Sequence, residues 1–376
     1  MRTRALSALA FLALWACSPK FDGPEKVKGL RILAVSSEPP EIGAASDGSG
    51  SPWPADHATI RSLVGHPQFA LDGSTQAVVL HLSCTPAPGE VAASPCTSVS
   101  ELSAPSDLLE LLDPASACNS PGTGAVDAIT FSGLEACSRL GCAPFSVLRD
   151  PGDPSSAVEL PAPAYALPAD FSLAALPAGN TQRLLGVDVV DLGLAVQAAP
   201  EDLAPPSPAA DGCATLGAVL SRFEEAWPAR PHLASLKWIH VRGPDMPAAS
   251  PPNHNPTLSG ITFDGAPLPL PGATPLPVSA GTRRDLLPKL PADFSTLREQ
   301  YQRFDTDGKL IDTRLEDWAY SWFATNGDLE NPHTQSWDEA NPYTPANGPA
   351  VLWLVVRDLR GGEAFTAGEV EAPPAP

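Results

Sequence analysis

The sequence predicts a mainly β fold built from two antiparallel sandwiches. Short apolar runs of strand length recur along the chain and are separated by turns rich in proline and glycine. The 45 prolines disfavour long helices and central strand positions, and they suit turns and sheet edges. Hydrophobic residues make up 43% of the chain, which is enough for a packed core. Packed antiparallel sheets are the architecture that this combination favours.

The N-terminal segment has the features of an export signal. Arg2 and Arg4 precede an apolar run over residues 5–16. This run is shorter than the roughly 20 apolar residues that a membrane-spanning helix needs. We therefore expect residues 1–16 to be a signal peptide that is removed before Cys17; an ordinary secretory peptide with an incidental cysteine is the alternative. Residues 17–28 are polar, contain proline and glycine, and are expected to form a tether.

Residues 29–245 are expected to form a first, decorated β domain. Apolar or alternating runs predict strands at residues 30–35, 57–64, 76–84, 183–196 and 233–241. Residues 85–175 lack such a pattern and are interpreted as an irregular insertion held by disulfides, with a short helix at residues 107–112. A longer helix is predicted where apolar side chains recur at helical spacing before Pro228, namely at Leu216, Val219, Leu220, Phe223 and Trp227.

A proline-rich segment follows, of which residues 246–256 are expected to be an exposed linker. A second β domain is predicted at residues 257–371, and residues 254–371 are expected to fold alone. Its strands are predicted at residues 257–263, 274–279, 317–324, 351–358 and 364–370. The strand at 351–358 is apolar at successive positions, and hence on both faces, as a central strand would be. Residues 372–376 are expected to be a disordered tail.

Aromatic residues alternate on the strand predicted at 317–324. Trp318, Tyr320 and Trp322 therefore share one face. We interpret this face as the core of the second sandwich, which would leave Phe323 exposed on the other face. The alternative is a platform on which sugar rings stack, and exposure of the Trp318 and Tyr320 rings would be its sign.

Six cysteines remain besides Cys17, and all lie between residues 84 and 213: Cys84, Cys96, Cys118, Cys137, Cys142 and Cys213. An even number in an exported chain predicts three disulfides, whose connectivity the sequence leaves open. A local Cys137–Cys142 bridge is favoured because a short loop closes easily. The chain has no C-x-x-C and no histidine at ligand spacing near these cysteines, so we expect no metal site there.

Charge and motifs exclude several classes of function. The chain carries 23 basic and 43 acidic residues, a formal net charge of −20. Such a surface repels phosphate backbones and anionic lipid headgroups, so a nucleic-acid partner is not expected. The sequence also lacks a G-x-S-x-G, a glycine-rich phosphate loop and an H-E-x-x-H. We therefore expect no catalytic residues, no cofactor and no enzyme activity. The alternative is an enzyme hidden in residues 85–213, for which a deep pocket lined by histidine and aspartate would be the sign.

Two further motifs have plain structural interpretations. Asp305, Asp307 and Asp312 resemble part of a calcium loop, but arginines stand where an EF-hand needs acidic ligands, so a hairpin turn at Asp307-Gly308 is the favoured interpretation. A looser calcium site is the alternative. The run from Asn253 to Pro256 lies at the expected domain boundary. We expect it to fix the angle between the domains, with a ligand role as the alternative.

Two resemblances extend these predictions. Leu14-Trp15-Ala16-Cys17 resembles the lipobox of bacterial lipoproteins, which implies cleavage before Cys17 and diacylglycerol on its sulfur. The pieces NPTLSGITFDG, SWFATNGDL and LWLVVRDLRGGEAF are similar to the strand pattern of Ig-like and PKD-like domains of bacterial surface proteins. The first region resembles a more decorated relative. The whole chain thus resembles uncharacterised Gram-negative bacterial lipoproteins with tandem Ig-like or PKD-like domains.

Together these observations predict a lipid-anchored protein of the cell envelope. Ser18 follows the cysteine where aspartate would imply retention in the inner membrane, so the outer membrane is favoured. The expected role is non-catalytic: binding, adhesion or envelope structure, with an unknown protein or glycan partner and the membrane contacted through Cys17. The alternative is a carbohydrate-binding or polysaccharide-processing component of the envelope.

Overall fold

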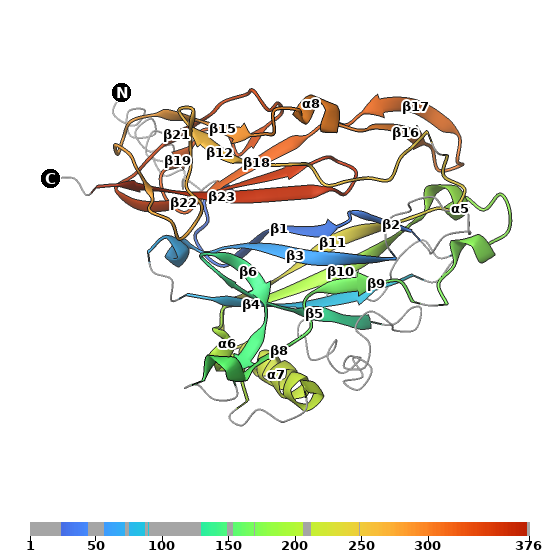
Figure 1. Ribbon diagram of the computed structural model, residues 1–376, viewed down its shortest axis with the longest axis horizontal. Helices are drawn as coiled ribbons and strands as arrows, with labels where there is room; N and C mark the ends of the chain where they lie inside the picture. Colours follow the sequence, from blue (N-terminus) through green and yellow to red (C-terminus); the bar gives the residue numbers. More distant parts are fainter. Residues whose placement is uncertain are drawn as a thin grey trace, which may run out of the picture.

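Two sandwiches, antiparallel except for the pairs β2 (Glu41–Gly43) with β11 (His232–Arg242) and β14 (Leu276–Pro277) with β23 (Glu363–Ala372), are stacked on one another in the computed structural model (Figure 1). The structure describes residues 24–43, 56–71, 75–86, 89, 129–148, 153–168, 170–205, 212–247 and 249–373. The predicted fold class, mainly β with two Ig-like sandwiches, is confirmed. The signal peptide expected at residues 1–16, Cys17 and the helix expected at residues 107–112 lie outside the described residues.

The first sandwich packs a three-stranded sheet against a six-stranded one. The smaller sheet has the order β1 (Arg31–Glu38), β3 (His57–Gly65), β9 (Ala164–Ala166). The larger sheet has the order β2 (Glu41–Gly43), β11 (His232–Arg242), β10 (Val187–Val196), β4 (Ala77–Cys84), β5 (Ile129–Ser138), β6 (Gly141–Pro144). The five strands predicted in this region are all present, as β1, β3, β4, β10 and β11. Residues 183–185, expected at the start of the strand that is β10, belong instead to a short helix.

Strand β5 corrects the expectation that residues 85–175 are irregular. It spans ten residues and pairs with β4 inside the sheet. Phe131 and Leu134 both face the same apolar cluster although they are three residues apart. The register of β5 on β4 shifts between them, beside Gly133 with its φ of 145°. This bulge breaks the two-residue period, so the sequence pattern could not reveal the strand.

Helix α7 (Gly212–Ala226) covers the outer face of the six-stranded sheet (Figure 1). All five residues on which it was predicted belong to one apolar cluster with the outward side chains of β4 and β10, among them Leu80 and Leu192.

Short elements complete this region: β7 (Ser146–Leu148), β8 (Ala157–Glu159), η1 (Pro67–Ala70), η3 (Pro154–Ser156), η4 (Leu173–Ala175), α5 (Gln182–Leu185) and α6 (Pro200–Leu203). No helix in the described parts of the chain combines the length and the apolar character needed to cross a membrane.

The second sandwich has two five-stranded sheets. One has the order β13 (Ala266–Pro267), β12 (Gly260–Phe263), β15 (Arg284–Lys289), β21 (Asn341–Thr344), β19 (Asp328–Leu329). The other has the order β14 (Leu276–Pro277), β23 (Glu363–Ala372), β22 (Gly348–Arg357), β18 (Ala319–Ala324), β20 (His333–Thr334). Helix α8 (Phe294–Leu297) and a hairpin of β16 (Gln300–Phe304) and β17 (Leu310–Leu315) lie outside these sheets. Ala372 ends β23, although the tail was expected to begin there.

Strand order gives both sandwiches an immunoglobulin-like topology. In the second sandwich, β12, β15, β21 and β19 take the places of strands A, B, E and D, while β18, β22 and β23 take those of C, F and G. In the first, β3, β4, β10 and β11 take the places of B, C, F and G. Trp322, on strand β18, is buried where this fold places a tryptophan on strand C.

The three-stranded sheet lies in the middle of the stack and serves both sandwiches (Figure 1). One apolar cluster joins Leu33 of β1 and Leu63 of β3 to alternate residues of β22, including Trp353. The other residues of β22, including Leu354, face the core of the second sandwich. The prediction that this strand is apolar on both faces is confirmed. Phe323 packs against the shared cluster and is half-buried, which corrects the expectation that it is exposed.

The expected tether and linker also belong to the packed body in part. Val27 is buried, and the chain around Lys26 pairs with Ala324 at the edge of β18. Ser250 and Asn253, within the segment expected to be exposed, are buried too. The proline content of this segment correctly predicted an irregular backbone. It could not predict whether that backbone is buried or exposed.

Candidate functional site

A buried polar group links the two sheets of the first sandwich. His81 of β4 lies with its Nδ1 2.9 Å from Oδ2 of Asp191 on β10. Its Nε2 lies 3.1 Å from Oγ of Ser62 on β3, which belongs to the opposite sheet. These are the connections of a serine–histidine–aspartate triad. The three residues stand on the strands that take the B, C and F places, where antibody domains have a disulfide and a tryptophan.

Glu135 of β5 completes this group, which we call the His81 cluster: Ser62, His81, Glu135 and Asp191. One carboxylate oxygen of Glu135 accepts a hydrogen bond from the Ser62 backbone amide at 2.9 Å and lies 3.3 Å from His81 Nε2. Glycines stand opposite His81 on both neighbouring strands, Gly193 on β10 and Gly133 on β5. A Cβ at Gly133 would lie 2.5 Å from Cα of Pro163, so glycine is required there.

The His81 cluster cannot work as a catalytic triad. Burial disfavours the charged imidazole, but the charges and hydrogen bonds of Asp191 and Glu135 outweigh it and raise the pKa of His81 to about 10. At neutral pH the ring is therefore an imidazolium, which cannot accept the proton of a serine hydroxyl. Each member is at most 5% exposed, so no substrate reaches Ser62. The cluster instead binds two sheets together through one cation and two carboxylates.

The raised pKa of His81 predicts a loss of stability in alkaline solution. A folded-state pKa of about 10 lies above the ordinary value of 6.5, so over this range the folded chain holds a proton that the unfolded chain releases. The free energy of unfolding should be at its full value below pH 6.5 and should fall as the pH rises through about 10. Urea titrations of wild type and His81→Gln across this window measure it. A difference between the two chains that does not vary with pH would contradict the assignment.

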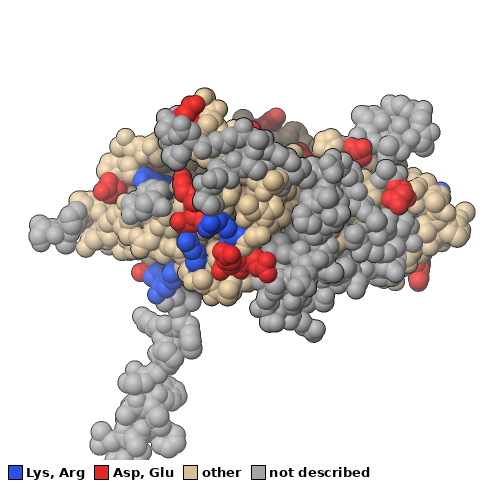
Figure 2. Space-filling model, turned by 90° about the horizontal axis from the view of Figure 1, so that it is seen from below, with Lys and Arg blue, Asp and Glu red and all other residues tan. Residues whose placement is uncertain are grey.

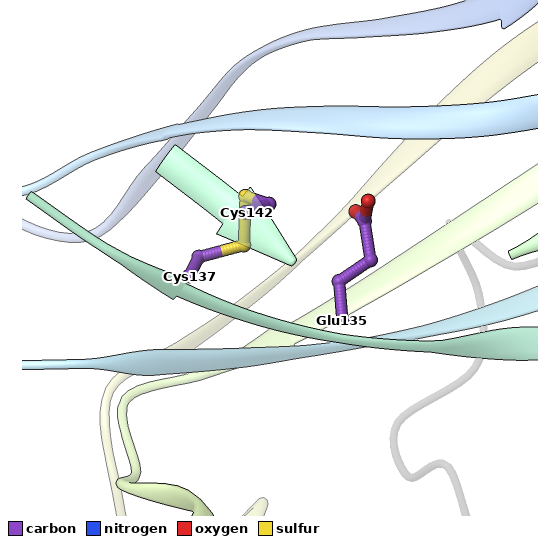
Figure 3. A group of neighbouring side chains, drawn as sticks. All are labelled: Glu135, Cys137 and Cys142. Carbon is purple, nitrogen blue, oxygen red and sulfur yellow. A yellow bond between two sulfur atoms is a disulfide. The ribbon is translucent and has the colours of Figure 1, made fainter. Parts of the chain in front are cut away.

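Cysteines provide covalent links in the same region. Cys137 and Cys142 form a disulfide across the β5–β6 hairpin, as favoured from their spacing. Cys84 is also disulfide-bonded. Cys96 and Cys118 lie outside the described residues, as does the side chain of Cys213. Glu135 lies near the Cys137–Cys142 sulfurs (Figure 3). Because these sulfurs are bonded to each other, they offer no thiolate to a metal ion.

The segment that resembles a calcium loop is the turn of the β16–β17 hairpin. Asp305 Oδ1 accepts hydrogen bonds from the backbone amides of Asp307 and Lys309, at 3.0 and 2.8 Å. Asp312 lies beside Arg314. The carboxylate of Asp305 therefore holds the turn, and Gly308 supplies the positive φ of 78° that the turn requires. The hairpin interpretation is confirmed.

The run from Asn253 to Pro256 holds the two sandwiches together, as expected. Asn253 donates its backbone amide to Glu41 of β2 at 2.8 Å and its side-chain amide to Asp358, after β22, also at 2.8 Å. Asn255 bonds the Ser37 carbonyl and accepts from the Glu363 amide. A groove of about 510 Å³ opens beside Asn255. Many of the polar groups that line this groove already take part in these contacts. We therefore interpret the groove as part of the interface between the two sandwiches and not as a ligand site.

The aromatic face of β18 is the core of the second sandwich. Trp318, Tyr320 and Trp322 are all buried. Their burial confirms the core interpretation and rules out a sugar-stacking platform formed by these three rings.

One exposed aromatic residue, Trp337, lies nearby. Trp337, in the segment between β20 and β21, packs against Phe294 of α8 with ring centroids 4.7 Å apart. Both rings border a depression of about 110 Å³, whose wall includes Trp318 and Tyr320. Trp337 was not predicted as a site residue because no periodic pattern surrounds it.

Charged side chains outside these sites are intermixed. On the face shown in Figure 2, the lysine and arginine side chains lie next to acidic ones and form no separate basic patch among the described residues.

Comparison with known proteins assigns no family. No protein-family model and no curated protein matches this chain. Trypsin-activated alpha-2-macroglobulin from Escherichia coli is a solved structure with some likeness: 8% identity, a TM-score of 0.21 and coverage of 92% of this chain. The chain spans 18% of the length of that protein. A likeness this weak supports no statement about the function of this chain.

Proposed function

We propose that this chain is a membrane-anchored surface lipoprotein whose Ig-like sandwiches serve a non-catalytic role in binding, adhesion or envelope structure. The observation that carries the proposal is a short leader ending at Cys17 and followed closely by a packed body, in which Val27 is already buried. Sandwiches of this kind present loops on a rigid scaffold, which suits binding. The His81 cluster, whose geometry alone would suggest hydrolysis, is sealed and protonated.

The anchor is tested by Cys17→Ala. We expect the wild-type chain to carry an N-terminal diacylglyceryl cysteine and to sediment with membranes, because two or more acyl chains hold a protein firmly. The variant should lack the lipid and remain in the soluble fraction. Mass spectrometry of the N-terminal peptide measures the modification directly. An intact leader, or cleavage elsewhere with a free Cys17 thiol, would contradict the proposal.

A second function, carbohydrate binding in the envelope, is favoured by one observation. Trp337 presents an exposed indole beside a small depression with polar residues at its edge. Support for the sugar-binding alternative comes from Trp337 alone of these rings, because those of Trp318 and Tyr320 are buried. Loss of glycan binding in Trp337→Ala would be its experimental sign.

A further inference from the structure

The geometry points to a binding site for a neutral pyranose ring in the depression between α8, the start of β18 and Trp337. This site rests on the proposed binding role and gives that role one class of ligand. The sugar would stack one face on the Trp337 indole, and its hydroxyls would bond to polar groups of the depression.

The Trp337 ring is held in position by its neighbours. Phe294 contacts the Trp337 ring and packs in turn against the core of the second sandwich. Trp337 is 45% exposed, so one part of the indole is supported while another meets solvent. An aromatic ring held in this way loses little conformational freedom when a flat apolar surface stacks on it. The C–H face of a pyranose is such a surface.

Tyr320 provides the second and independent sign of a ligand. Its side chain is only 2% exposed and lines the depression, and its hydroxyl makes no hydrogen bond within the described part of the chain. The hydroxyl oxygen is not among the buried polar atoms that lack a partner, so solvent reaches it and it is open to a ligand. Burial also raises the pKa of Tyr320 to about 12, so the group stays protonated and able to donate. A hydroxyl of a bound sugar would take the place of that solvent.

The charges at the edge favour a neutral ring over an acidic one. Asp317 lines the depression, where its Oδ1 lies 3.7 Å from Nη2 of Arg298, and Arg298, Asp317 and Asp338 all act electrostatically on Tyr320. Arg298 also lines it, but its guanidinium already donates to the Glu316 carbonyl at 2.7 Å. Gln335 has a side-chain amide that forms no bond within the described part of the chain. Carboxylates accept hydrogen bonds from sugar hydroxyls, and amides both accept and donate them. A uronate would meet an edge of net negative charge, because the two carboxylates outnumber the one guanidinium.

A proline-rich peptide is the other ligand that aromatic ridges recognise. Such peptides bind in extended grooves, whereas this depression is compact at about 110 Å³ and bordered by acidic and amide groups. The polar edge matches the closely spaced hydroxyls of a sugar better than a polyproline backbone, which offers only carbonyl acceptors. The observations therefore favour the sugar.

Saturation-transfer NMR on the full chain tests the site. The probes are neutral trisaccharides of glucose, galactose, mannose and N-acetylglucosamine, with trigalacturonate and a proline-rich octapeptide as contrasts. We expect transfer to at least one neutral sugar, about tenfold weaker binding in Trp337→Ala and a several-fold loss in Tyr320→Phe. Trp238→Ala is the matched control, because Trp238 is 46% exposed but lies on β11 of the first sandwich. It should bind as wild type does.

Other outcomes would overturn the site. They are no transfer to any neutral trisaccharide, equal binding by wild type and Trp337→Ala, or transfer only to the uronate or the peptide. Unchanged binding by Tyr320→Phe would remove Tyr320 from it. The lipidated N-terminal peptide is measured on the same preparation. If lipid is present and sugar binding is absent, the sugar site fails while the proposed anchoring stands. If sugar binding is present and lipid is absent, the anchoring fails while the sugar site stands.

Discussion

Replacing His81 with alanine should lower the free energy of unfolding by about 3–5 kcal/mol. The substitution removes the cation that lies between Asp191 and Glu135, both of which are buried. Two carboxylates would then remain in the sandwich interior without their partner, and Ser62 would lose its contact with the ring nitrogen. Breaking a buried ion pair from one side is among the most destabilising single changes because the remaining charge cannot be solvated.

Urea unfolding measures this loss, and His57→Ala is the matched control. His57 is also a histidine of the first sandwich, on β3, but its side chain is exposed and pairs with the exposed Asp56. Exposed pairs contribute little to stability, so the control should unfold nearly as wild type does. If His81→Ala is as stable as His57→Ala, then the His81 cluster does not hold the sheets together.

Replacing Trp322 with alanine should remove about 3–5 kcal/mol from the stability of the second sandwich. Trp322 is 1% exposed in the core of that sandwich and pairs with Leu354 across β18 and β22. Its indole also donates a hydrogen bond to Thr334 Oγ1 at 3.1 Å, so the substitution would leave a buried hydroxyl without its donor. A loss of this size is a large part of the roughly 5–15 kcal/mol that usually separates folded from unfolded domains.

Trp337→Ala is the appropriate control for Trp322, since it removes the same side chain from the surface of the same sandwich. Its loss should be limited to the contact with Phe294, about 0.5–1.5 kcal/mol. Thermal melts followed by circular dichroism compare the two variants with wild type. A Trp322→Ala chain that melts together with the Trp337→Ala chain would show that the core of the second sandwich has been misidentified.

Local pattern explains which parts of the fold could be predicted. The strand containing Trp353 was found because its apolar residues are continuous, and helix α7 because apolar residues recur at its period. Strand β5 was missed because its bulge at Gly133 shifts the period. Strand β15 (Arg284–Lys289) was missed because charged ends and Pro288 leave only Leu286 and Leu287 as apolar residues. Both strands were missed because a short or bulged strand has too few regularly spaced apolar residues to be recognised from its own sequence.

The sites depended on contacts between distant segments, which no local pattern reports. Ser62, His81 and Asp191 each interrupt an apolar strand, and a search for such polar interruptions at inward positions could have grouped them. Which of them meet is decided by pairing between β3, β4 and β10. Trp337 lies near Phe294 only because the segment between β20 and β21 folds back onto α8. Asn253 was singled out because asparagine side chains often bond their own backbone in turns, but its side chain bonds Asp358 instead.

The pairing of residues 25–27 with β18 determines how a pulling force would enter the molecule. Val27 donates its amide to the Ala324 carbonyl at 2.9 Å, and Ala324 donates to the Glu25 carbonyl at 3.0 Å. A few residues later the same chain becomes β1, which pairs along β3 of the first sandwich. Tension applied at the N-terminal side would therefore act on the hydrogen bonds to β18 of the second sandwich first. The pairing of β1 with β3 in the first sandwich would bear the load only after those bonds have broken.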